Sequence, residues 1–263
     1  MMNLVDEASG FVWSCPLKKK REAAGGFNKF LSWLRDQVSD SKASGKSNIH
    51  FISVLHSDRG GEFTSGPVGN EKKRSYFDKI CMKHGIKRRL TSAYSPHQNG
   101  RAERANRTLF KTMRCALMDS GMKWKYWVDA YFVGLNARNR IPRTGGRASP
   151  FEIFYGFCPE FARLMPFGAT AILGKRGSKK DIDKGIIGRM IGYPSDTNGW
   201  KFIVKGKNKP VVTEDAIFDL RTFEEQALRR AVQENNDEEE DKGLPLGGTD
   251  AEIREAIKDM KMK

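Results

Sequence analysis

The sequence predicts an α/β layer fold followed by a small, separate β-rich domain. Up to about residue 160, apolar runs of strand length alternate with segments of helical periodicity. Beyond that point the chain consists of short β-type runs separated by Gly, Pro, Asp and Asn turns. We therefore expect a first domain at 1–160, a β domain at 164–221, and a C-terminal segment at 222–263.

The elements expected in the first domain follow one another as strand, helix, strand, helix, strand and helix. "GFVWSCPLKKK" (10–20) is rich in β-formers and predicts a strand. After a Gly-Gly break, apolar residues at helical spacing from Phe27 to Val38 predict an amphipathic helix. The later elements are a strand at 49–55, a short helix at 76–85 stopped by Gly85, a strand at 86–92, and helices at 102–121 and 124–140.

The β-rich segment predicts a small β-barrel, built from "FGATAILGK", "GRMIGYPSDTNGWKFIV" and "PVVTEDAIFDL". After it, "QENNDEEED" (233–241) predicts a solvated acidic linker. The last segment opens with a capping-box pattern, Thr249 to Glu252, which predicts a short terminal helix.

The charge is strongly and unevenly basic. The net charge is +15, and residues 224–263 hold 7 Lys/Arg and 12 Asp/Glu of the totals of 47 and 32. The remaining 40 basic and 20 acidic residues give residues 1–223 a net charge of +20. Such a surface favours a polyanionic partner, of which nucleic acid is the commonest. The alternative is a soluble basic protein without such a partner.

The composition also argues against several protein classes. No apolar stretch reaches the ~18 residues of a membrane span, so no membrane role is expected. The N-terminus lacks the charged and apolar regions of a secretory signal. The four cysteines are scattered without CxxC spacing, which argues against a zinc site or disulfide framework and fits a reducing intracellular compartment.

Two acidic residues stand in glycine-rich, basic surroundings. Asp58, in "LHSDRGGEFTS", falls just past the strand at 49–55, and Glu103 lies at the start of the basic helix. Carboxylates that converge at a sheet edge can hold Mg²⁺, and two such ions can promote in-line attack on a phosphodiester. Each residue also has a simpler interpretation, since Asp58 is a good turn residue and Glu103 can pair with Arg107 four positions on.

The helix that carries Glu103 also carries a basic stripe. Arg104, Arg107, Lys111 and Arg114 are spaced by 3, 4 and 3 positions, which places them on one face. Such a stripe is more often a solvated surface than a track for phosphates, and the net charge of +20 in residues 1–223 narrows the difference between the two interpretations. Asn99-Gly100 precedes the helix as a turn whose flexibility would let a DNA end approach.

Taken together, three motifs resemble the integrase of copia-type retrotransposons, within the retroviral integrase superfamily. They are "LHSDRGGEF", "FDKICMKHGIKRRLTSAYSPHQNGRAERANRTL" and "NRIPRTGGRASPFEIFYG", in the order that the family uses. In the β-rich region "IGYP" with "DAIFD" resembles the family's SH3-like domain. The resemblance covers residues 3–221.

The resemblance implies an RNase H-like core, with a mixed sheet flanked by helices, that uses three acidic residues with Mg²⁺ or Mn²⁺. The family's second acid falls on Asp58 and its catalytic Glu on Glu103. Asn99 and Gly100 match the loop that the family uses near the DNA end. Arg101, Arg104, Arg107 and Lys111 are then candidate phosphate contacts.

The sequence departs from the family pattern at two places. The 44 residues between Asp58 and Glu103 are more than the family uses, and the extra ones fall in an expected surface loop at 65–74, where insertions are tolerated. The family's first catalytic Asp lies on a strand that precedes the one matched by "NLVDEAS" (3–9). We therefore expect that first strand and its Asp to be absent, with Asp6 no substitute.

The expected function is polynucleotidyl transfer in DNA integration, by 3′-end processing and strand transfer, with catalysis impaired in this fragment of a Pol polyprotein. The expected partners are element ends, target DNA and further copies of the chain, in the nucleus, with no small-molecule substrate. The alternatives are a non-catalytic nucleic-acid-binding module that keeps the basic surface, and a general RNase H-like nuclease.

Overall fold

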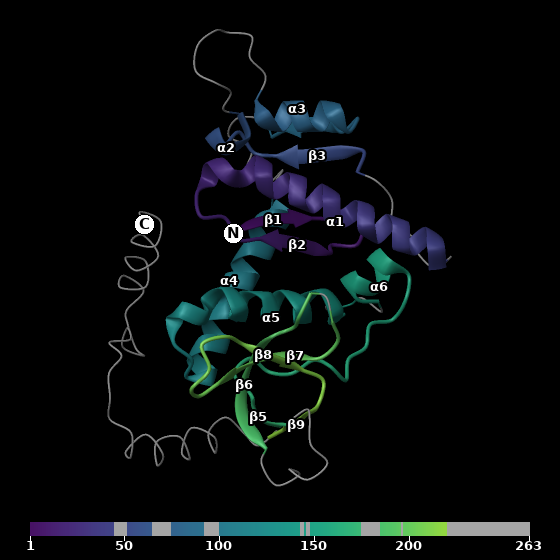
Figure 1. The fold of residues 1–263 in the computed structure, drawn as a ribbon. Helices are drawn as coiled ribbons and strands as arrows, with labels where there is room; N and C mark the ends of the chain where they lie inside the picture. Colours follow the sequence, from purple (N-terminus) through teal and green to yellow (C-terminus); the bar gives the residue numbers. More distant parts are fainter. Residues whose placement is uncertain are drawn as a thin grey trace. The chain divides into compact units, whose positions relative to one another are not determined.

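The computed structural model describes residues 1–44, 52–64, 75–91, 100–142, 145, 148–174, 185–195 and 197–219 (Figure 1). These residues form two compact units. Unit 1 holds Met1–Thr108 and Asn139–Pro159, and unit 2 holds Leu109–Arg138 and the described residues from Glu160 onward. Each unit combines segments that are distant in the sequence. The expected domain boundaries, 1–160 and 164–221, stay a prediction.

Unit 1 contains two pairs of strands. β1 (Met2–Val5) is antiparallel to β2 (Val12–Cys15), and β3 (Val54–Ser57) is parallel to β4 (Lys87–Leu90). Among the described residues the two pairs are separate two-stranded sheets. The predicted α/β class is confirmed, and the strands described in unit 1 form one antiparallel and one parallel pair.

One hydrophobic core packs against both strand pairs. It joins Met2 and Cys15 from the β1–β2 pair to Leu55 and to Ile86, which precedes β4. Helices α1 (Ala23–Ser44) and α3 (Tyr76–Lys83) cover it with Phe27 and Phe77, whose ring centroids lie 5.3 Å apart. The two strand pairs are therefore held together by side-chain burial.

Helix α1 differs from its prediction because it runs through the two glycines expected to break the chain. It follows a short 3-10 helix, η1 (Lys20–Glu22), and contains both Gly25 and Gly26. A Cβ on Gly26 would lie 2.9 Å from Met2 Cε and 3.1 Å from Leu17 Cδ2. The missing side chain lets the first turn of α1 pack closely on β1, and this packing outweighs the ~1 kcal/mol helix penalty of a glycine.

Helix α3 is fixed at both ends as the sequence predicts. Ser75 accepts from Asp78 N at the N-terminus, and the Asp78 carboxylate accepts from Ser75 N in return. Gly85 follows the C-cap with φ of +66°, so its predicted capping role is confirmed. A short helix, α2 (Gly61–Thr64), precedes α3.

Two long helices and one short helix complete the helical part of the chain. α4 (Gly100–Ser120) and α5 (Trp127–Arg140, after the 3-10 turn η3, Trp124–Tyr126) match the predicted helices to within a few residues. α6 (Pro150–Tyr155) was not predicted from the sequence. It begins with a Ser149 cap followed by proline and ends at Gly156 with φ of +81°.

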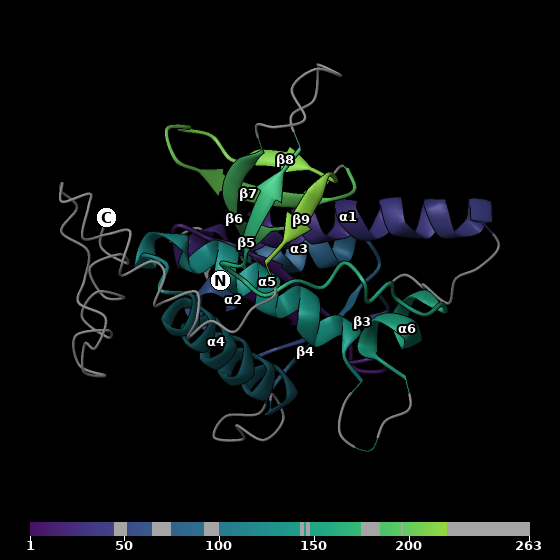
Figure 2. The ribbon, with the colours of Figure 1, turned by 90° about the horizontal axis from the view of Figure 1, so that it is seen from below.

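Unit 2 contains a curled antiparallel sheet in the order β8-β7-β6-β5-β9 (Figure 2). The strands are β5 (Thr170–Leu173), β6 (Ile186–Gly192), β7 (Trp200–Val204), β8 (Val211–Thr213) and β9 (Ala216–Phe218). Met190 and Phe202 are fully buried within it. The predicted β-rich segment is confirmed, and its SH3-like character stays a prediction.

The acidic linker and terminal helix expected at 222–263 lie outside the described residues. In the part of the chain that is described, no helix combines the length and apolar character needed to cross a membrane.

Candidate nucleic-acid and metal site

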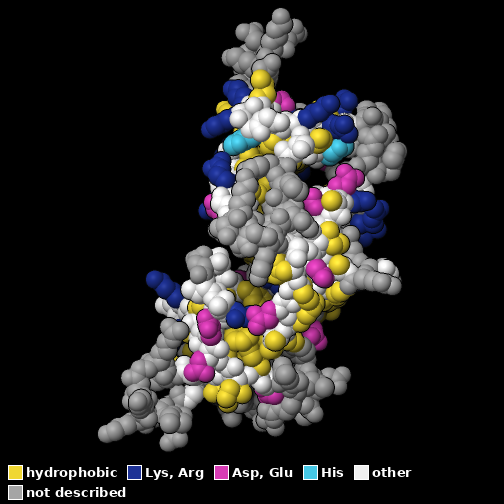
Figure 3. Space-filling model, turned by 90° about the vertical axis from the view of Figure 1, so that its right-hand side faces the viewer, with side chains coloured by type: hydrophobic (Ala, Val, Ile, Leu, Met, Phe, Trp, Pro, Cys, Tyr) yellow, Lys and Arg dark blue, Asp and Glu magenta, His cyan; other side chains and the backbone are white. Residues whose placement is uncertain are grey.

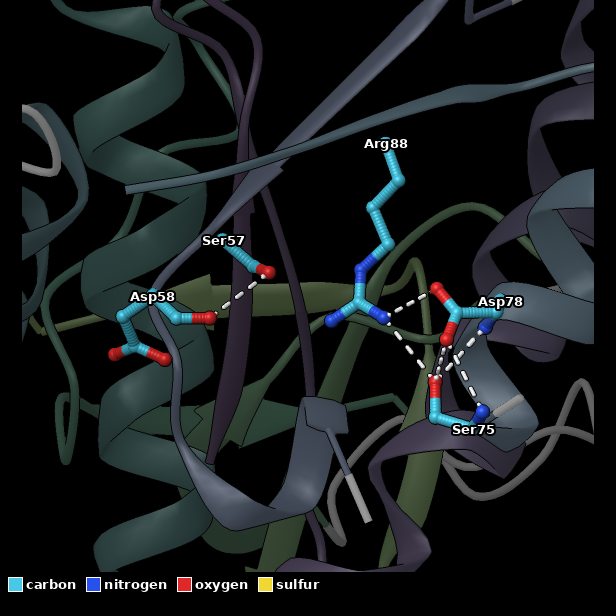
Figure 4. Close-up of polar contacts among 5 residues, drawn as sticks. All are labelled: Ser57, Asp58, Ser75, Asp78 and Arg88. Atoms are coloured by element: carbon cyan, nitrogen blue, oxygen red, sulfur yellow. Dashed lines mark hydrogen bonds and ion pairs between the residues drawn. The ribbon is translucent and has the colours of Figure 1, made fainter. Parts of the chain in front are cut away.

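Asp58 lies where the sequence places it, directly after the parallel strand β3. Its Oδ1 accepts a hydrogen bond from Gly60 N at 3.0 Å, and Ser57 Oγ donates to the Asp58 carbonyl at 3.1 Å. Asp58 therefore does form the turn that its residue type favours, while its side chain stays exposed. Figure 4 shows the Asp58 carboxylate and the Ser57 hydroxyl pointing in different directions, and the Ser57 side chain is buried.

Glu103 lies in the first turn of α4 with its side chain exposed. A carboxylate in this position is stabilised by the positive end of the helix dipole. The described residues show no ion pair between Glu103 and Arg107, so the simpler interpretation of Glu103 as a helix salt-bridge partner gains no support. The carboxylate remains available for a ligand.

The carboxylates of Asp58 and Glu103 fit a hard divalent cation, but they are two ligands where the resemblance implies three. Exposed carboxylate oxygens are the ligands that Mg²⁺ prefers. Across the described ranges, however, no group of three or more His, Cys, Asp or Glu is arranged to hold an ion. Asp6, between β1 and β2, is occupied locally, because its Oδ2 accepts from Ser9 N at 2.8 Å and from Ser9 Oγ at 2.5 Å.

The basic residues of α4 divide into one anchor and an exposed stripe. Arg101 donates to the Glu7 carbonyl, and Asn3 Nδ2 donates to Asn106 Oδ1 at 2.6 Å, so α4 is tied to β1 and the turn after it. Arg104, Arg107 and Lys111 are exposed, whereas Arg114 is half-buried. The α4 stripe is therefore Arg104, Arg107 and Lys111.

The loop before α4 is only partly described. Gly100 is the first residue of the helix, and a Cβ there would lie 3.2 Å from Arg104 Nη1. Glycine at this position thus leaves room for the Arg104 guanidinium. Asn99 lies outside the described residues. The roles assigned to these residues stay predictions.

A largely buried polar cluster that was not predicted from the sequence joins Arg88, Asp78 and Ser75 (Figure 4). Arg88 Nη1 donates to Asp78 Oδ1 at 2.7 Å and to Ser75 Oγ at 3.1 Å, and only 10% of its side chain is exposed. Its Nε and Nη2 are buried without an acceptor in the described structure. The guanidinium also lies over the Phe77 ring, 5.8 Å from the centroid.

This cluster locks α3 onto β4. Burial acts to raise the pKa of Asp78, but hydrogen bonds from Ser75 and Arg88 outweigh it, and the net pKa lies below its usual value. The register that sets Arg88 opposite buried Leu55 turns its side chain inward. Alternation along "IKRRL" was the available signal, because Ile86 and Arg88 share one face.

Comparison with known proteins finds relatives among transposon polyproteins, although no family model matches the chain. A Pol polyprotein from transposon TNT 1-94 of Nicotiana tabacum is 27% identical over 220 residues, which cover 82% of this chain. A Pol polyprotein from transposon RE1 of Arabidopsis thaliana is 27% identical over 63% of the chain, and a Ty1-LR3 Gag-Pol polyprotein of Saccharomyces cerevisiae is 24% identical over 90%.

The chain spans a small share of these relatives, 15%, 10% and 14% of their respective lengths. It is homologous to a segment of retrotransposon Pol polyproteins, and the resemblance inferred from its motifs is confirmed at that level.

Two solved structures are similar to parts of the chain. The catalytic core domain of BIV integrase is 21% identical with a TM-score of 0.39, and the match covers 58% of this chain and 82% of that one. A simian T-cell lymphotropic virus intasome structure is 15% identical with a TM-score of 0.45, covering 80% of this chain and 72% of that one.

Proposed function

We propose that this chain is the integrase-core segment of a retrotransposon Pol polyprotein and acts in DNA integration through 3′-end processing and strand transfer. The observation that carries the proposal is the position of the two acids. Asp58 is exposed at the carboxyl end of a parallel strand, and Glu103 is exposed in the first turn of the basic helix α4. Both lie within the segment homologous to Pol polyproteins.

Asp58 and Glu103 would hold Mg²⁺ or Mn²⁺ through their carboxylate oxygens. When bound, such an ion activates the attacking oxygen and stabilises the leaving oxygen of a phosphodiester. The residues of the chain itself would bind and orient the DNA. The α4 stripe would contact backbone phosphates, and the α4 N-terminus, which begins at Gly100, would face the DNA end.

We further propose that catalysis by these 263 residues is impaired. Two carboxylates hold metal ions less firmly than three, and Asp6 is already bonded to Ser9. The partners of the active assembly would be element ends, target DNA and further copies of the chain, and the expected place of action is the nucleus.

A strand-transfer assay tests both proposals. The chain is incubated with a labelled model DNA end, target DNA, and Mg²⁺ or Mn²⁺. We expect no joined product from residues 1–263, and joined product after addition of an N-terminal strand that carries an Asp. The restored activity should disappear in Asp58→Asn and in Glu103→Gln. Robust joining by the unextended chain would contradict the impairment.

The second candidate is a nucleic-acid-binding module without catalysis. It is favoured by the exposed α4 stripe, which can contact phosphates without a metal ion. The same experiment separates the two. A module that only binds should retain salt-dependent DNA affinity and yield no joined product, even with the added strand and Asp.

A further inference from the structure

The outward face of β3 and β4 is a basic surface that the motifs did not indicate. Side chains alternate along a strand, so the register that turns Leu55 and Arg88 into the core turns their neighbours outward. His56 lies opposite Arg89, and Val54 lies opposite Lys87. His56, Lys87 and Arg89 are all exposed.

Arg59 extends this surface past the end of β3. Its Nε donates to the Thr91 carbonyl at 3.1 Å, which fixes the arginine across the ends of the two strands. We define the β3–β4 basic face as His56, Arg59, Lys87 and Arg89. Figure 3 shows Lys and Arg side chains beside His side chains in the part of unit 1 where Figure 1 shows α3 and β3.

Within the described segment 75–91, basic residues outnumber acids on and beside β4. Residues 75–91 hold five Lys/Arg and a single acid, Asp78, which is engaged by Arg88 at 2.7 Å. Asp78 is therefore already paired with Arg88 rather than with Lys87 or Arg89. The parallel register also places them about 4.8 Å from the strand that leads to Asp58.

The buried cluster gives the surface a fixed geometry. Arg88 ties β4 to the N-terminus of α3 through Asp78 and Ser75, and a backbone bond from Lys87 N to Ser53 O at 2.8 Å continues the β3–β4 pairing. Lys87 and Arg89 thus flank a residue that is held in place. Cations carried on a fixed strand lose less backbone freedom on binding a phosphate backbone than cations on a loop.

We propose that the β3–β4 basic face is a second phosphate-contact surface for duplex DNA, distinct from the α4 stripe and leading away from Asp58. The inference rests on the proposed function in taking DNA as the ligand. Contacts from exposed cations on a strand face go to the backbone, so this surface should add affinity without sequence preference.

The test is a binding titration of the full chain with a short labelled duplex in EDTA over a series of salt concentrations. EDTA removes any contribution of a metal ion. Each lost phosphate contact lowers the salt slope by about 0.9, so Lys87→Ala/Arg89→Ala should lower it by about 1.8. At 0.1 M salt this corresponds to roughly 60-fold weaker binding, if affinity extrapolated to 1 M is unchanged.

A matched control is Lys207→Ala/Lys209→Ala, which removes the same charge from exposed positions between β7 and β8. It should leave the slope nearly unchanged. The double swap Lys87→Arg/Arg89→Lys should keep the slope, because phosphate contact needs only the charge. Equal losses in the control, or an unchanged slope in Lys87→Ala/Arg89→Ala, would overturn the proposal.

The α4 stripe is tested separately with Arg104→Ala/Arg107→Ala/Lys111→Ala. If only this variant weakens binding, the β3–β4 face is not a contact surface and the α4 assignment of the proposed function stands. If only the Lys87/Arg89 variant weakens it, the inference stands and the α4 assignment fails. Losses that add in the combined variant support both surfaces.

Discussion

Replacing Asp78 with alanine should destabilise unit 1 far more than replacing its partner Arg88 with methionine. In Asp78→Ala the guanidinium stays buried and loses its carboxylate, so that only Ser75 Oγ remains as an acceptor. In Arg88→Met the buried charge disappears, and with it the two nitrogens, Nε and Nη2, that have no acceptor in the described structure.

The expected size follows from three contributions. Loss of the reciprocal Ser75–Asp78 cap costs about 1 kcal/mol. Breaking a fully buried ion pair costs ~3–5 kcal/mol, but the Asp78 side chain is 36% exposed, which reduces that loss to about 1–2 kcal/mol. Asp78→Ala should therefore cost about 2–3 kcal/mol, and Arg88→Met less than about 1 kcal/mol.

The assay is equilibrium unfolding in urea, with amide hydrogen exchange of residues 76–90 to localise the effect. The double variant Asp78→Ala/Arg88→Met should be more stable than Asp78→Ala by about 1 kcal/mol, because the uncompensated guanidinium is removed. Equal destabilisation by the two single changes, or strictly additive losses, would refute the reasoning.

Three further predictions concern pH and backbone conformation. The lowered pKa of Asp78 contributes stability above its ordinary value of 3.8, so acid unfolding below that pH should become shallower in Asp78→Asn. Burial raises the pKa of Tyr155 from 10.0 to about 12, so stability should fall by about 2–3 kcal/mol between those pH values and should not do so in Tyr155→Phe. Gly168→Ala should cost over ~2 kcal/mol in a thermal melt, since its Cβ would lie 2.4 Å from Ser120 Cβ, whereas Gly206→Ala, at a similar φ with open space, should cost only about 1.

The sequence was most informative where structure depends on local chemistry. Gly85 ends α3 because a positive φ suits glycine, and Asp58 follows its strand because an Asp before two glycines forms a turn. Features set by distant contacts were missed. Gly26 lies inside α1 because Met2 packs against it, and Arg88 is buried because of the register that β4 adopts with β3.

In the candidate site, too, features set by local sequence were predicted and features set by distant contacts were missed. The motif order identified the homologous polyproteins, and helical spacing placed Arg104, Arg107 and Lys111 on one exposed stripe. The β3–β4 basic face was not predicted from the sequence. Lys87 and Arg89 can be assigned to one exposed face only when their neighbour, Arg88, is known to point inward.

Metal-directed cleavage tests most directly whether Asp58 and Glu103 bind the same metal ion, as proposed. Fe²⁺ with ascorbate and peroxide is added to the full chain, and the cut sites in the backbone are mapped. We predict cuts next to both Asp58 and Glu103 that are suppressed by excess Mg²⁺, and loss of both cuts in either Asp58→Asn or Glu103→Gln. Cleavage beside only one of the two residues, or cuts at one residue that persist when the other is replaced, would contradict a shared ion.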